Sequence, residues 1–136
     1  MKPVVQKNIQ WLLRLLAAVI MLQTLYFKFT AAEESVYIFT TLHMEPWGRI
    51  GIGVMELIAS ILILFPATTV YGALLGAGLM SGAMFFHLTQ LGLVVMDDGG
   101  QLFIYACIVW LSCIALVWME KQKLSGLLSF ILKYKA

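Results

Sequence analysis

The chain has 136 residues, of which 62% are hydrophobic and 12% are charged, with a formal net charge of +2. Soluble domains carry about a quarter charged residues, so this composition and the mean hydropathy of +0.93 exclude an ordinary soluble protein. The small net charge, without a basic and aromatic cluster, indicates no nucleic-acid partner, and the length predicts a single membrane domain over residues 1–136.

Four apolar runs dominate the sequence, and each approaches the ~20 residues that a helix needs to cross a bilayer. Backbone groups in lipid must be satisfied within the segment, so the runs predict helices and an all-α, four-helix integral membrane bundle. The expected spans are residues 9–27, 47–65, 70–91 and 102–119. Two lysines precede the first run without a small-residue cleavage site after it, which predicts an uncleaved first span.

The connections differ in length and character. In residues 28–46, Thr30-Ala31-Ala32-Glu33 fits a capping box, so we expect a short helix there that lies at the membrane interface. The second and third spans are joined by the tight turn 66–69, and the third and fourth by a loop containing Asp97 and Asp98. In residues 121–136, Leu124, Leu127, Leu128 and Ile131 predict an amphipathic helix on the cytoplasmic leaflet, with a frayed tail as the alternative.

The distribution of basic residues predicts the orientation. The side with both termini carries six lysines, whereas the opposite side carries only Lys28 and Arg49, both at span ends. The positive-inside rule therefore places both termini in the cytoplasm and the first connection on the periplasmic side of a multi-pass inner-membrane protein.

Two charges lie inside the predicted spans. A charged residue at that depth costs about 2.5–3.5 kcal/mol on insertion scales, so we expect each to have a partner. Arg14 lies ~20 Å and Glu56 ~13 Å below the outer end, a gap that a guanidinium stem can bridge. We therefore predict an Arg14–Glu56 ion pair, which either fixes helix order only or also serves function.

Polar side chains also gather at the predicted outer mouth. His87 lies one turn below that end, either as a satisfied interfacial histidine or as part of a ligand site. We predict the ligand-binding set His87, Lys28, Arg49, Glu45 and Glu56, a polar column descending from the periplasmic side. We expect no metal: His43, Glu45 and His87 have suitable types but no ligand spacing.

Small residues and cysteines have structural interpretations. The pairs Gly72/Gly76 and Gly78/Gly82 in the third span permit close helix approach, within the bundle or in a homodimer. Cys107 and Cys113 lie on different faces of one predicted helix, so we interpret them as small apolar residues rather than a disulfide.

Several short motifs, in this order and spacing, resemble the DoxX family of small four-helix bacterial inner-membrane proteins. They are Arg14, Phe27-Lys28-Phe29, Glu45-Pro46-Trp47-Gly48-Arg49, Glu56-Leu57, His87-Leu88-Thr89-Gln90-Leu91-Gly92 and Asp98-Gly99-Gly100-Gln101-Leu102-Phe103. The resemblance implies polar-site roles for Arg14, Lys28, Glu56 and His87. It also implies a link to membrane oxidoreductases, because founding relatives resemble a subunit of a thiosulfate:quinone oxidoreductase. Residues 23–26, Gln-Thr-Leu-Tyr, replace the usual glycine-rich end of the first span and suggest a subgroup.

Three functions follow as alternatives. The first is a quinone- or lipid-interacting subunit of a membrane redox system, in which a quinone carbonyl accepts from His87, Lys28 or Arg49. Because the sequence has no redox centre of its own, this role requires bound quinone or a soluble or membrane redox partner. The second is a non-catalytic anchor or assembly partner, and the third is a proton-coupled carrier that uses Glu56. Whether the protein is an enzyme stays open.

Overall fold

The fold is an all-helical membrane bundle. The computed structural model describes residues 2–135, and within that range its regular elements are helices without any strand. Four helices are long and apolar enough to cross a membrane. They are α1 (Pro3–Phe29), α3 (Trp47–Leu64), α4 (Thr69–Phe86) with its extension η1 (His87–Leu91), and α5 (Gln101–Met119). The predicted four-helix fold is therefore confirmed.

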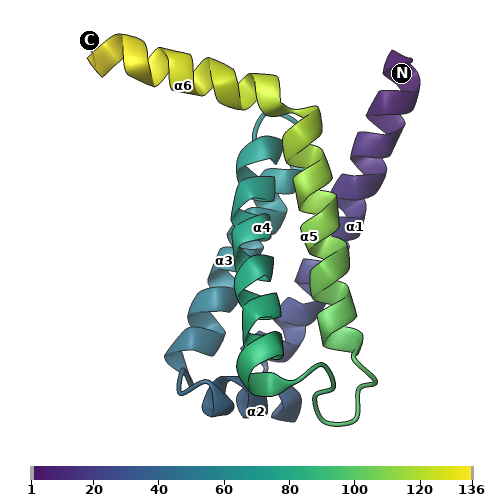
Figure 1. Cartoon of the computed structure of the whole chain (residues 1–136), viewed down its shortest axis with the longest axis vertical. Helices are drawn as coiled ribbons and strands as arrows, with labels where there is room; N and C mark the ends of the chain where they lie inside the picture. The colour runs from purple at the N-terminus through teal and green to yellow at the C-terminus, as the bar shows by residue number, and fades with distance from the viewer. Residues whose placement is uncertain (1, 136) are drawn as a thin grey trace.

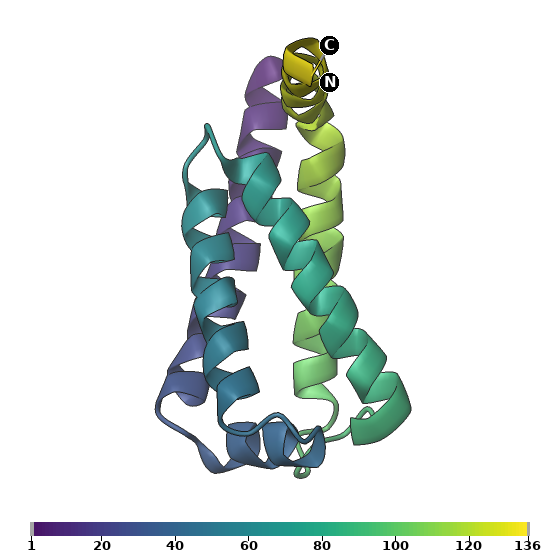
Figure 2. The same cartoon turned by 90° about the vertical axis from the view of Figure 1, so that its left-hand side faces the viewer.

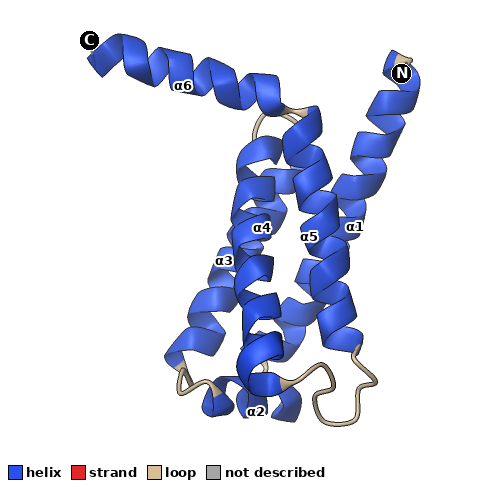
Figure 3. Cartoon of the chain, viewed as in Figure 1, coloured by secondary structure: helices blue, strands red, loops and turns tan. Residues whose placement is uncertain are grey.

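The four spans form a ring in which α1 packs on α3, α3 on α4, α4 on α5 and α5 on α1 (Figure 1). Both termini lie at one end of the ring, which we call the termini end, and α2 (Glu33–Thr41) lies across the opposite end, the α2 end (Figure 3). All connections between the spans are short helices or loops at these two ends.

The half nearer the termini end is closely packed through small residues. Ala17, Ala59 and Ala73 are fully buried there. A Cβ atom added to Gly72 would lie 2.6 Å from the backbone nitrogen of Ile63, and one on Gly76 would lie 2.8 Å from Cys113 Sγ. The first predicted glycine pair is thus used within the bundle, where it lets α4 approach its neighbours closely.

The helices α3 and α4 start together and then separate. The Thr68 and Thr69 hydroxyls donate hydrogen bonds to the carbonyls of Leu62 (2.8 Å) and Ile63 (2.9 Å), which fastens the turn between them. From this turn the two helices diverge toward the α2 end (Figure 2). This divergence makes room for a cavity in the α2 half of the bundle.

The predicted short helix exists as α2, but the predicted capping box does not form. The helix begins after Ala32, whose side chain has no hydrogen-bonding atom, and the Thr30 hydroxyl donates to the carbonyl of Tyr26 at 2.6 Å. Thr30 therefore ends α1 instead of starting α2, and its backbone N–H also donates to the carbonyl of Tyr26, at 3.1 Å. Ser35 and Phe39 are the buried residues of α2, and they face the bundle mouth.

The sixth helix, α6 (Lys121–Lys135), leaves the bundle sideways at the termini end (Figure 1). It is an ordered helix and not the frayed alternative. Lys123 Nζ donates to the carbonyl of Pro66 at 2.8 Å, and every residue of α6 except the half-buried Leu124 is exposed. Its placement on a cytoplasmic leaflet stays a prediction.

Candidate functional site

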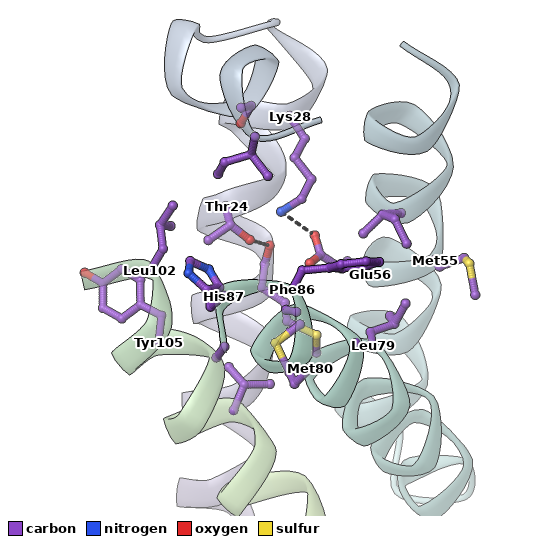
Figure 4. Close-up of a pocket in the computed structure, with 18 of the residues that line it drawn as sticks. Thr24, Lys28, Met55, Glu56, Leu79, Met80, Phe86, His87, Leu102 and Tyr105 are labelled. Atoms are coloured by element: carbon purple, nitrogen blue, oxygen red, sulfur yellow. Dashed lines mark hydrogen bonds and ion pairs between the residues drawn. The ribbon is translucent and has the colours of Figure 1, made fainter. Parts of the chain in front are cut away.

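The predicted Arg14–Glu56 ion pair is wrong. Glu56, whose side chain is 4% exposed, pairs instead with Lys28, and Lys28 Nζ lies 3.0 Å from Glu56 Oε2. Lys28 lies on the last turn of α1 and turns its side chain back into the bundle, to the level of Glu56 (Figure 4). The long side chain of Lys28 therefore supplies the charge partner of Glu56. The estimated depths of Arg14 and Glu56 in the membrane had predicted Arg14 for this role.

Arg14 has a structural role near the termini end. Its Nε donates to the carbonyl of Ile63 at 2.8 Å and its Nη2 to the carbonyl of Leu64, while its guanidinium lies 3.7 Å from the Trp11 ring centroid. The last four carbonyls of a helix have no intrahelical partner, and Ile63 and Leu64 end α3. Arginine thus caps α3 and ties it to α1.

Glu45 and Arg49, both predicted as ligand-binding residues, bind each other. Arg49 Nε donates to Glu45 Oε1 at 2.9 Å and to Oε2 at 3.0 Å, and Arg49 Nη1 donates to the carbonyl of Lys28. Neither residue is among those that line the cavity between the described helices. The two hold the start of α3 against the end of α1, and so fix the base from which Lys28 reaches inward.

A cavity of about 750 Å³ occupies the α2 half of the bundle, between all four spans and beneath α2 (Figure 4). Its wall is mainly apolar, with residues such as Leu79, Met80 and Phe86. Three of the five predicted binding residues, Lys28, Glu56 and His87, line it. The polar lining residues are Gln23, Thr24, Lys28, Glu34, Ser35, Glu56, His87, Gln101 and Tyr105.

His87 is both a structural residue and a residue of the cavity wall. It is 6% exposed, and its Nδ1 lies 2.9 Å from the carbonyl oxygen of Gly92, where the backbone turns at φ +80°. A carbonyl oxygen only accepts, so Nδ1 carries a hydrogen, and Nε2 keeps a free lone pair whenever the ring is neutral. The ring also packs edge-on against Phe103 at 5.7 Å between centroids.

Six further polar residues line the wall that the sequence analysis did not predict as ligand-binding residues, and three of them, Thr24, Glu34 and Tyr105, keep a hydrogen-bonding position free. Tyr105 Oη accepts from Gln101 Nε2 at 2.8 Å, so its own O–H remains able to donate. Thr24 donates to the carbonyl of Met21 at 2.9 Å and keeps acceptor lone pairs. The one available signal was the stretch of residues 23–26, where the chain departs from the family pattern, because Gln23 and Thr24 belong to it.

Glu34 is the third, on α2 at the roof of the cavity. Its Oε1 is buried and has no hydrogen-bond partner among the described residues. Burial, and secondarily the negative charge of Asp98, raises the pKa of the Glu34 carboxyl above its ordinary value. Asp98 itself accepts hydrogen bonds from the backbone N–H groups of Val95, Gly100 and Leu102 at 2.8–3.2 Å.

His43 and the two cysteines do not line the cavity. His43 is exposed at φ +60°, and residues 2–135 contain no group of three or more His, Cys, Asp or Glu side chains that could hold a metal ion. Both cysteines are free: Cys113 is buried against Gly76, and Cys107 Sγ lies 3.7 Å from Met84 Sδ.

Comparison with known proteins agrees with this architecture. No curated protein and no solved structure matches the chain. The DoxX-like family matches residues 12–112, a range that runs from the first turns of α1 into α5 and contains every residue of the cavity wall. The chain is therefore a member of the DoxX-like family and an integral membrane protein.

Proposed function

We propose that this protein binds a quinone, or a lipid-soluble molecule with a similar headgroup, in the cavity of the α2 half. It would do so as the membrane subunit of a redox system in the bacterial inner membrane. A partner protein, soluble or membrane-bound, would exchange electrons with the quinone. The excess of basic residues at the termini end supports a cytoplasmic position for both termini, and the cavity would then open toward the periplasmic side.

The observation that carries this proposal is the chemistry of the cavity. Sites for small ligands are typically ~300–1,000 Å³, mainly apolar, and contain a few convergent polar groups. The cavity has a volume of about 750 Å³ and combines an apolar wall with Lys28, Glu56, His87 and Tyr105 (Figure 4). Structural polar groups are normally satisfied by one another, whereas several groups here retain a free donor or acceptor.

The free groups suit both oxidation states of a quinone. An oxidised ring presents two carbonyl oxygens, which accept hydrogen bonds, and the Lys28 ammonium and the Tyr105 hydroxyl can donate to them. A reduced ring presents two hydroxyls, which donate, and His87 Nε2 and the Thr24 hydroxyl oxygen can accept from them. A site that must hold both forms needs donors and acceptors together.

The proposal is tested by ligand extraction and by binding to matched variants. Protein purified in mild detergent should release quinone on solvent extraction, and a tail-less benzoquinone should bind to quinone-depleted protein. Tyr105→Phe removes one hydroxyl from the cavity and should weaken binding by about 2–10-fold, the effect of one hydrogen bond. Tyr26→Phe is the control, because Tyr26 is exposed on the outer face of α1.

Wild-type protein that releases no quinone and binds none would contradict the proposal. If a protein co-purified in fixed ratio instead, the assembly-partner function would take its place. Equal weakening by Tyr105→Phe and Tyr26→Phe would show that the measured binding is not to the cavity.

A further inference from the structure

The second glycine pair of α4 is not used for packing between the described helices of the chain. A Cβ atom added to Gly78 or Gly82 would meet no described atom within 4 Å, whereas Gly72 and Gly76 have neighbours at 2.6 and 2.8 Å. Both Gly78 and Gly82 line the cavity, and Gly78 is exposed on the outside of the bundle as well. The missing side chains therefore leave an open space beside the cavity.

Gly78 and Gly82 lie on α4, which diverges from α3 toward the α2 end of the bundle (Figure 2). Met55 on α3 and Leu74 on α4 line the cavity and are each 41% exposed, so the cavity reaches the lipid-facing surface between the two helices. Gly78 lies about 14 Å along the helix axis from His87, toward the middle of a membrane-spanning helix. The opening thus faces hydrocarbon and not water.

The two sides of the cavity differ in chemistry. The wall between α3 and α4 consists of apolar side chains and the two glycines: Ile52, Met55, Leu74, Leu75, Gly78, Leu79, Gly82 and Phe86. The wall between α1 and α5 carries Gln23, Gln101 and Tyr105. Figure 4 shows Tyr105 on one side of the cavity and Met55 and Leu79 on the other, with His87, Lys28 and Glu56 between them.

We propose that the opening between α3 and α4 is a lateral doorway that holds the hydrocarbon tail of the ligand. The headgroup then lies beside Lys28 and His87, and the tail passes over Gly78 and Gly82 into the bilayer. This inference rests on the proposed function and extends it, since it assigns the ligand to long-chain amphiphiles and makes the two glycines determinants of tail recognition. An apolar wall at membrane depth provides no hydrogen bond to a headgroup but matches a hydrocarbon chain.

The test compares two ligands on matched variants. Gly78→Leu and Gly82→Leu each add an apolar side chain to open space and should leave the melting temperature within a few degrees. Each should weaken binding of a long-tailed quinone by about tenfold or more, because the leucine displaces buried methylene groups of the tail. Binding of a tail-less benzoquinone should change less than about twofold. Gly51→Leu is the control, since Gly51 is exposed on α3, has no described atom near its Cβ position and does not line the cavity.

The outcomes separate the doorway from the proposed function. If wild-type protein binds neither ligand, the proposed function fails and the doorway fails with it. If the variants bind both ligands like wild type, or lose both equally, the doorway is wrong while the headgroup site stands. If Gly78→Leu separates a dimer into monomers without changing long-tail binding, the glycines form a protomer interface and the doorway is again wrong.

A second measurement does not depend on filling the doorway. Met55→Trp places an indole at its edge, and a ligand brominated on the first methylenes of its tail should quench that indole's fluorescence strongly. Ile58→Trp, on the exposed face of α3 outside the cavity, is the control and should be quenched no more than the native tryptophans. Equal quenching at both positions would overturn the proposed path of the tail.

Discussion

The two halves of the bundle bury polar groups in different ways. In the termini half, Arg14 is bonded to the last carbonyls of α3, and the Ser60 and Thr69 hydroxyls donate to backbone carbonyls at 2.8–2.9 Å. In the α2 half, His87 and Tyr105 each use one hydrogen-bonding position and leave another free. His87 and Tyr105 line the cavity, whereas Arg14, Ser60 and Thr69 do not. Contact with the cavity, and not depth in the membrane, therefore separates the candidate site residues from the structural polar residues.

The same contrast applies to one sequence pattern. Gly72/Gly76 and Gly78/Gly82 have identical spacing on one helix, but the first pair lies against backbone and side chains and the second beside a cavity. A small-residue pair permits close approach, and whether a neighbour fills the space depends on helix tilt. The divergence of α3 from α4 decides the outcome here (Figure 2).

The largest expected effect comes from breaking the Lys28–Glu56 pair, the one charge pair that lines the cavity among the described residues. Lys28→Met or Glu56→Gln leaves the other group without its partner, and removal of one partner of a buried pair typically costs about 3–5 kcal/mol. The double variant should lose less than the sum of the two single losses. Unfolding in detergent measures these free energies, and additive losses would show that the two groups act independently.

Arg14→Met should sharpen the comparison, because Arg14 belongs to the packed half. Hydrogen bonds to charged groups contribute about 1.5–3 kcal/mol, so the free energy of unfolding should fall by at least that amount. The affinity of the folded protein for quinone should stay unchanged. Arg14→Lys keeps the charge but cannot donate to both carbonyls as the guanidinium does. It should therefore restore only part of the lost free energy of unfolding. If quinone affinity fell in parallel with stability, the two halves would not be separable.

The two glycine pairs provide a smaller and closely matched test. Gly72→Ala places a Cβ against the backbone of α3, which cannot move aside, and should cost about 1–3 kcal/mol as overpacking. Gly78→Ala places the same atom in open space and should be neutral or stabilise by up to about 1 kcal/mol through helix propensity. Melting temperatures of the two variants in one detergent decide this, and similar losses would remove the distinction between the pairs.

The smallest expected effects are pH dependences of the two acidic groups near the cavity roof. Burial opposes the ionisation of Asp98, but its three backbone N–H donors and the neighbouring His87 outweigh burial and hold its pKa below the ordinary value. Its stabilising contribution is therefore complete above pH ~4 and is lost as the pH falls through the lowered pKa. Asp98→Asn should therefore reduce the decrease in melting temperature that wild-type protein shows as the pH falls below ~4.

Glu34 should have the opposite sign. Because burial raises its pKa, the folded state holds a proton that the unfolded state has already lost, and stability decreases as the pH rises from ~4.3 through the raised pKa. Glu34→Gln should remove that decrease, while the loss of stability at low pH that Asp98 causes should remain. Melting curves of both variants from pH 3 to 8 check the two signs, and a shared sign would contradict the assigned environments.

The sequence was sufficient for the helices but not for the cavity. Each span is defined by its own apolar length, so the bundle, the short helix α2 and the tail helix could be predicted without knowledge of their neighbours. The partners of Arg14 and Glu56 depend on the direction that a long side chain takes along its helix. Lys28 reaches back into the bundle and pairs with Glu56, although the estimated depths in the membrane had predicted Arg14 as the partner. Glu34 and Tyr105 line the cavity only because α2 lies across the end of the bundle and α5 packs between α4 and α1, arrangements that no single segment encodes.

Photolabelling is the most direct test of the claim that the α2 half of the bundle binds the ligand and the termini half is structural. A quinone with a photoreactive azide on its ring can be cross-linked to the purified protein, and the labelled peptides can then be mapped by mass spectrometry. We predict labels on the cavity wall, in residues 20–28, 52–56 and 101–106, and their loss when unlabelled quinone is added in excess. Labels concentrated around Arg14 and Ile63, or spread evenly over the lipid-facing surface without competition, would contradict this division of the bundle.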